Sequence, residues 1–129
     1  QVISSKHYEA DVCIVCCTDD RFTPLMDKFV TVRGYKYIDW IRVAGGAKDL
    51  TGDYLSNQIV KLVALHHTKQ LVISEHIECG AFNGEKDADF YAKDLQRIKI
   101  ETGAYLKKNG HSIPVTAYLA KFDGLYEVK

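Results

Sequence analysis

The run Asp11–Cys17, with the sequence DVCIVCC, is the strongest indication of the fold because it has almost no polar residue. A short run of this kind is typical of a strand that is buried on both faces, and such strands occur mainly in parallel sheets. Thr18, Asp19 and Asp20 follow at once and indicate a loop. The run therefore predicts a buried strand of a parallel sheet, with a polar loop at its carboxyl end.

Strand patterns and helical spacing alternate along the rest of the chain. The alternation predicts an α/β fold in which helices flank an open, mostly parallel sheet of four to five strands. With 129 residues, 47% of them hydrophobic, the chain has the size of one domain, so 1–129 is expected to form a single domain. The expected elements are 22–30 (helix), 37–43 (strand), 51–68 (helix), 70–74 (strand), 88–108 (helix), 113–121 (strand) and 125–128 (a short fifth strand).

The charge pattern limits the classes of partner. Acidic and basic residues balance at 17 each without a cluster of one sign, which does not favour nucleic acid or a membrane surface. The longest apolar runs are far shorter than the roughly 18 residues that cross a bilayer. We therefore expect a cytoplasmic protein whose partner is a small molecule or another copy of the chain.

The four cysteines do not fit a disulfide framework. Cys13, Cys16 and Cys17 are crowded into one strand, where neighbouring side chains point to opposite faces. Reduced thiols, or thiolates on a metal, fit better. Because a C-x-x-C pair inside a strand faces two ways, Cys13 and Cys16 are both assigned to the core.

Metal-binding residue types follow the first and third strands. Cys17, Asp19 and Arg21 come after the first strand, and His76 and Cys79 come after the third. Ligands of open α/β sheets bind at the carboxyl ends of the strands, where the strand order reverses. If the two strands are neighbours, Cys17, His76 and Cys79 form a zinc site with three protein ligands. Its fourth position is open to water or a carboxylate, as in catalytic zinc sites.

Plainer interpretations exist for some of these residues. A free cysteine such as Cys17 is most often a small buried hydrophobe. Asp19 and Arg21 could form an ordinary loop ion pair, which contributes little to stability when exposed. The other histidines are assigned to the surface: His7, His66, His67 and His111.

Three segments of the chain resemble motifs of the β-class carbonic anhydrases. Cys17–Arg21 (CTDDR) resembles the family's C-x-D-x-R, and His76–Ala81 (HIECGA) resembles its H-x-x-C-G-A. Between them, Ile41–Gly46 (IRVAGG) is similar to the family's R-N-A-G segment. The order of the segments agrees as well, and the resemblance runs from about Asp11 to the final strand.

The resemblance implies an enzyme, a zinc-dependent carbonate dehydratase that hydrates carbon dioxide reversibly to bicarbonate by zinc-bound hydroxide. Zinc would be held by Cys17, His76 and Cys79. Asp19 would be either a fourth ligand or, drawn away by Arg21, a catalytic residue that orients the hydroxide. A homodimer or a multiple of it is also implied.

Two departures from the family's pattern keep other functions open. Glu75 stands where the family usually has glycine, and Val43 replaces the asparagine of R-N-A-G. They favour a related zinc hydrolase that acts on another small electrophile, such as carbonyl sulfide or carbon disulfide. A third hypothesis is a non-catalytic zinc domain in which Asp19 permanently fills the fourth position. His67 and Glu75 are the residues considered for proton transfer.

Overall fold

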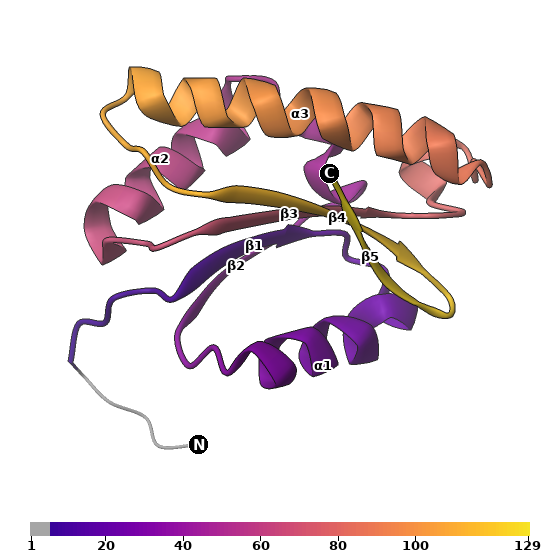
Figure 1. Cartoon of the computed structure of the whole chain (residues 1–129), viewed down its shortest axis with the longest axis horizontal. Coiled ribbons are helices and arrows are strands. Elements are labelled where there is room, and N and C mark those ends of the chain that lie inside the picture. Colours follow the sequence, from indigo (N-terminus) through magenta and orange to yellow (C-terminus); the bar gives the residue numbers. More distant parts are fainter. Residues whose placement is uncertain (1–5) are drawn as a thin grey trace.

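The computed structural model describes residues 6–129, whose five strands form one sheet in the order β2-β1-β3-β4-β5 (Figure 1). The first four strands of the chain run parallel, and β5 pairs antiparallel with β4. The predicted mostly parallel α/β sheet is therefore confirmed, including its fifth strand. The strands are β1 (Val12–Cys16), β2 (Ile38–Arg42), β3 (Leu71–His76), β4 (Val115–Lys121) and β5 (Gly124–Val128).

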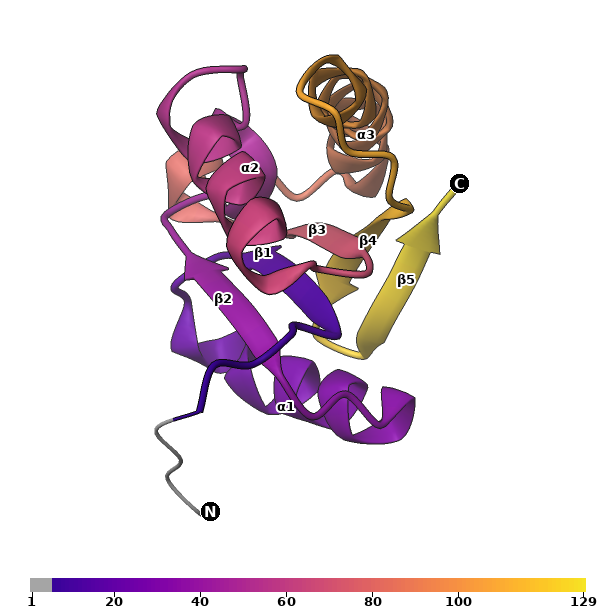
Figure 2. The same cartoon turned by 90° about the vertical axis from the view of Figure 1, so that its left-hand side faces the viewer.

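Three helices cover the two faces of the sheet (Figure 2). Helix α1 (Thr23–Arg33) packs on one face, and α2 (Tyr54–His66) and α3 (Ala88–Lys108) pack on the other. The inner strands are buried on both sides and divide the core into two clusters. Each cluster takes alternate residues of β1 and β3, as the period of two in a strand requires.

Local sequence signals explain where the helices begin and end. Pro24 lies in the first turn of α1, where backbone N–H groups have no partner within the helix, so its missing N–H costs no hydrogen bond. Gly34 ends that helix in a left-handed conformation. Helix α2 begins three residues later than expected because Gly52, at φ 85°, turns the chain away from helical geometry. The carboxylate of Asp87 accepts a hydrogen bond from the Asp89 N–H and caps α3.

Two expectations need correction. Strand β3 continues to His76 instead of ending at Ser74, because it pairs with β4 as far as Ala120. His66 is not a surface residue, since its Nδ1 lies 2.7 Å from an oxygen of the buried Asp39. The hydroxyl of Tyr8 donates to the other oxygen of that carboxylate.

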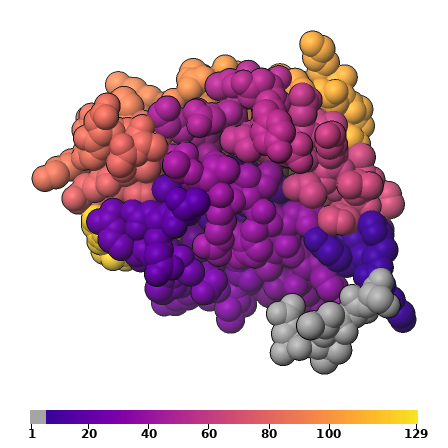
Figure 3. Space-filling model, turned by 180° about the vertical axis from the view of Figure 1, so that it is seen from behind, coloured from indigo at the N-terminus to yellow at the C-terminus, as the bar shows by residue number. Residues whose placement is uncertain are grey.

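The strand order places a switch point between β1 and β3. The chain goes from β1 to β2 on one side and then crosses to β3 on the other side, so the connections leave β1 in opposite directions. Strand β2 is one edge of the sheet. Seen from behind, the purple atoms of this part of the chain lie in the middle of the visible face (Figure 3). None of the helices within residues 6–129 is both long and apolar enough to cross a membrane.

Candidate metal centre

Two thiols and one imidazole converge at the carboxyl ends of β1 and β3. Cys17 follows β1 directly, His76 is the last residue of β3, and Cys79 lies in the loop after it. One potential ligand atom from each residue lies within 4.8 Å of the other two. Within residues 6–129 this is the one such group of histidine, cysteine or acidic side chains. The structure thus brings together the three residues that the sequence placed at one metal site.

The imidazole of His76 is oriented as a metal ligand would be. Its Nδ1 lies 2.8 Å from the Ile77 carbonyl, which only accepts hydrogen bonds, so Nδ1 carries the proton. Nε2 is then left with a lone pair, and it is buried without a hydrogen-bond partner in the described chain. The ring is held flat against Phe22, with the ring centroids 4.4 Å apart. A buried acceptor is costly unless something binds it, so this geometry fits a metal ion.

Asp19 and Arg21 form the predicted pair beside the cluster. Arg21 Nη2 and Nε donate to Asp19 Oδ2 at 2.6 and 3.1 Å, and the Arg21 backbone N–H donates to Oδ1 at 3.0 Å. The hydrogen bonds from the Arg21 side chain are the main reason that the pKa of Asp19 falls to about 2. Asp19 Oδ2 also lies 3.6 Å from His76 Nε2. An ionised carboxylate therefore stands next to the cluster at neutral pH, with both of its oxygens held by Arg21.

Two aromatic rings contact the Arg21 guanidinium, and this contact was not predicted from the sequence. The Arg21 guanidinium lies 5.8 Å from the ring centroid of Phe22 and 5.3 Å from that of Phe122. The two rings contact each other, with their centroids 5.0 Å apart. Cation–π contacts of this kind fix the direction of a guanidinium. Phe122 comes from the turn between β4 and β5, about a hundred residues away along the chain, so no local pattern could indicate this role.

Cys79 is positioned by a tyrosine of α3. The Tyr91 hydroxyl accepts a hydrogen bond from the Cys79 N–H at 3.3 Å and donates one to the Glu85 carbonyl at 2.8 Å. Burial raises the pKa of the Cys79 thiol, and the nearby Cys17 adds to this effect. Tyr91 is fully buried, and the helical period of α3 gives the only sequence signal for it.

The glycine pair after β2 lets the backbone pass close to the cluster. Gly46 has a positive φ of 59°, and a Cβ atom on it would lie 3.2 Å from the Cys17 nitrogen. Together with Ala44 and Gly45, the cluster residues and Asp19 line an open cavity of about 290 Å³. The arginine of the same segment, Arg42, lies over the ring of Trp40, with its guanidinium carbon 4.3 Å from the ring centroid.

The two residues considered for proton transfer lie elsewhere. His67 pairs with Glu9 at 3.0 Å, near the start of β1 and so at the opposite end of the strands. The side chain of Glu75 is buried and lies near Asp94 of α3. Burial, with the neighbouring Asp94 carboxylate as the second cause, raises the pKa of Glu75 to about 10. At neutral pH Glu75 is therefore a neutral core residue.

Glu75 should make the stability of the protein depend on pH. Between its ordinary pKa of 4.5 and the raised value of about 10, the folded chain keeps a proton that the unfolded chain has lost. Raising the pH from 5 to 9 should therefore favour unfolding, with a slope of up to about 1.4 kcal/mol per pH unit from this group. In Glu75→Gln this slope should vanish, as urea unfolding across the pH range would show. Glu101→Gln, an exposed change on α3, should keep it; equal slopes in all three proteins would contradict the assignment.

Comparisons with known proteins agree on the fold. No family model and no curated protein sequence matches the chain. A β-carbonic anhydrase from Trichomonas vaginalis superposes with a TM-score of 0.65 at 14% identity, covering 99% of this chain and 87% of that one. Carbonic anhydrase from Streptococcus mutans superposes with a TM-score of 0.62 at 20% identity, covering 95% of this chain and 84% of that one. A carbon disulfide hydrolase superposes with a TM-score of 0.58 at 13% identity, covering 95% of this chain and 81% of that one. The chain has the fold of the β-carbonic anhydrases.

Proposed function

We propose that this protein is a zinc-dependent carbonic anhydrase that interconverts carbon dioxide and bicarbonate. The observation that carries the proposal is the convergence of Cys17, His76 Nε2 and Cys79 beside an ionised Asp19. Two thiolates and one imidazole are a ligand set that zinc accepts, and a fourth position remains for the reaction. Zinc in such a site lowers the pKa of water toward neutrality and so supplies hydroxide as the nucleophile.

The protein's own residues would orient the reactants. Because Arg21 engages both oxygens of Asp19, the carboxylate is held beside the cluster without being drawn fully into it. There it would accept a hydrogen bond from the attacking water or hydroxide and fix its lone pair. The cavity walls include the small side chains of Ala44 and Ala81, which suit a small apolar substrate such as carbon dioxide. The same geometry argues against a closed site in which Asp19 is a permanent ligand.

A hydrolase of carbonyl sulfide or carbon disulfide is the second candidate. The fold is shared with a carbon disulfide hydrolase, and a cavity that suits carbon dioxide also suits its sulfur analogues. The Glu75 departure supports this candidate less than the sequence alone suggested, because its carboxyl group lies near α3.

Replacing Asp19 by alanine should lower the rate of carbon dioxide hydration about a hundredfold or more while zinc stays near one per chain. The expected loss reflects the removal of the group that orients the nucleophile, which is not one of the three proposed ligands. Stopped-flow assays at pH 7 and 8.5, with metal analysis of each sample, would measure both quantities. Asp20→Ala is the matched control, since it removes the adjacent exposed carboxylate and should keep the rate.

The other outcomes separate the hypotheses. Zinc without hydration, together with hydrolysis of carbonyl sulfide or carbon disulfide, would establish the second candidate. Zinc without any of these activities would indicate a structural site, and a protein purified without zinc would overturn the proposal. We also infer from the resemblance that the protein is a homodimer or a multiple of it, which light scattering would test.

A further inference from the structure

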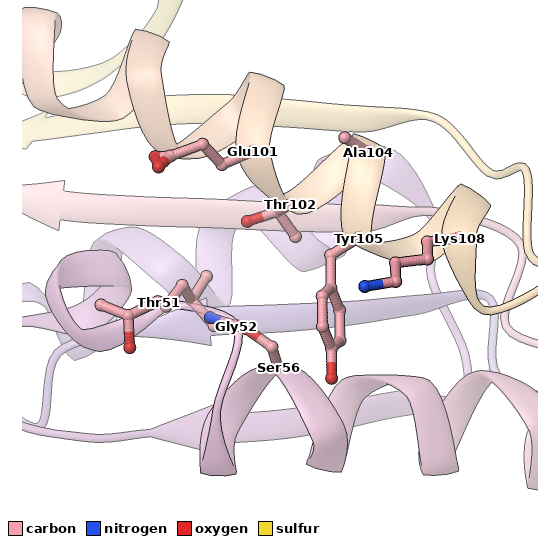
Figure 4. A pocket seen from close by; sticks show the side chains of 9 residues that line it. Thr51, Gly52, Ser56, Glu101, Thr102, Ala104, Tyr105 and Lys108 are labelled. Carbon is pink, nitrogen blue, oxygen red and sulfur yellow. The ribbon is translucent and has the colours of Figure 1, made fainter.

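A second cavity lies between α3 and the segment that leads into α2 (Figure 4). Its volume is about 290 Å³, close to the lower end of the range for small-molecule sites. It shares no lining residue with the cavity over the metal cluster, and its partly apolar wall includes Leu50 and the ring of Tyr105. The polar groups in its lining indicate what it could bind.

Thr102 lines this cavity and carries an unused hydroxyl group. The residue is only 4% exposed, and its Oγ1 has no hydrogen-bond partner among residues 6–129. A buried threonine in a helix usually bonds to a carbonyl of the preceding turn, which Thr102 does not do. Figure 4 shows its side chain directed from α3 toward the space above Gly52 and Ser56. Oγ1 itself has less than 1 Å² of accessible surface, so a small rotation of the side chain must open it to the cavity, where a polar ligand atom would then satisfy the hydroxyl group.

Ser56 presents a hydroxyl group from the opposite side. Its Oγ accepts a hydrogen bond from the Gly52 N–H at 3.0 Å, so the hydroxyl hydrogen remains to be donated. Like Thr102, Ser56 is buried. Two buried O–H donors on facing walls call for a ligand that supplies acceptor oxygens.

The charges of the lining favour an anion. The carboxylate of Glu101 is already paired with Arg97 at 2.8 Å. Lys108, the other charged residue of the lining, forms no ion pair in the described part of the chain. The uncompensated charge at this cavity is therefore positive.

We propose that the cavity binds a small monocarboxylate with an apolar body. The carboxylate oxygens would accept hydrogen bonds from Thr102 and Ser56 near the charge of Lys108, and the apolar body would lie against Leu50 and Tyr105. The volume suits a molecule of about ten non-hydrogen atoms. Benzoate is a suitable probe because it has this size, one carboxylate and an apolar ring.

Titration of the isotope-labelled 129-residue chain with benzoate, followed by amide NMR shifts, tests the proposal. We expect saturable shifts at Gly52, Ser56 and Thr102, with a dissociation constant on the order of 1 mM. Benzamide, which has the same shape without the charge, should bind at least about fivefold more weakly, and benzylamine should not bind. Reading the shifts at these amides separates this site from any binding of benzoate at the metal centre.

Variants assign the binding to the proposed groups. Thr102→Val removes only the hydroxyl group and should weaken benzoate binding about tenfold, and Lys108→Gln should weaken it several-fold. Lys107→Gln changes the neighbouring lysine, which does not line this cavity, and should bind as the parent protein does. Thr102→Val loses no hydrogen bond of the described structure and should fold normally. The proposal fails if no saturable shift appears up to about 20 mM, if benzamide binds equally well, or if both lining variants bind like the parent.

Discussion

Replacing Cys17 by serine should reduce the zinc content of the purified protein from about one per chain to less than about a tenth. Cys17 is one of three potential ligands that lie within 4.8 Å of each other, and a neutral serine hydroxyl replaces a thiolate poorly. Loss of a residue that merely supports a ligand lowers metal affinity by about 10- to 100-fold, so loss of the ligand itself should cost at least as much. Metal analysis after dialysis, and competition with a coloured chelator, would measure the change.

The adjacent cysteine supplies the control for this prediction. Cys16 is the last residue of β1, directly before Cys17, but its side chain is buried with Val12, Ile14 and Met26 on the face covered by α1. Cys16→Ala should therefore keep zinc near one per chain, although the small cavity that it leaves should lower stability by about 1 kcal/mol. If Cys17→Ser and Cys16→Ala bind zinc equally well, the proposed ligand set is wrong.

The alternation of side chains along β1 shows why the core of the site could be predicted from the sequence. A buried parallel strand fixes the alternation of side chains, which sends Cys13 and Cys16 to opposite sides of the core. Residues at the carboxyl ends of two neighbouring parallel strands lie close together, and the strand order confirms that β1 and β3 are neighbours, with the switch point between them. The sequence predicted that Cys17 and His76 would meet if these strands were neighbours, and the strand order fulfils that condition.

The remaining parts of the site depend on contacts that no local pattern encodes. Tyr91 and Phe122 come from α3 and from the turn after β4, and they reach Cys79 and Arg21 only when the sheet is assembled. The end of β3 was misplaced for the same reason, because its last pairs are set by β4. His66 looked exposed at the end of an amphipathic helix, but a buried carboxylate on a neighbouring strand binds it. Long-range partners of this kind cannot be read from hydrophobic periodicity.

Gly46→Ala should destabilise the protein by roughly 2–5 kcal/mol, the largest effect that we expect from adding a single methyl group. The backbone of Gly46 is left-handed, with φ at 59°, which disfavours any residue that has a Cβ atom. A Cβ atom there would also lie 2.3 Å from the Ser74 carbonyl oxygen, a backbone atom that cannot move without disturbing β3. The short 3-10 helix η2 (Gly46–Asp49) would have to shift away from the strand. Urea unfolding would measure the change in free energy.

Gly34→Ala separates the steric clash from the backbone strain. Gly34 is left-handed too, with φ at 70°, but a Cβ atom on it would meet nothing within 4 Å. Its substitution should therefore cost only the strain, about 1–2 kcal/mol. Gly46→Ala should also lower the zinc content, because the added Cβ atom would lie 3.2 Å from the Cys17 nitrogen and the shift that relieves the clash would disturb this residue, whereas Gly34→Ala should leave zinc bound. Equal losses of stability in the two variants would mean that the loop after β2 does not press on β3, and the close approach of this loop would then have no part in holding Cys17 in place.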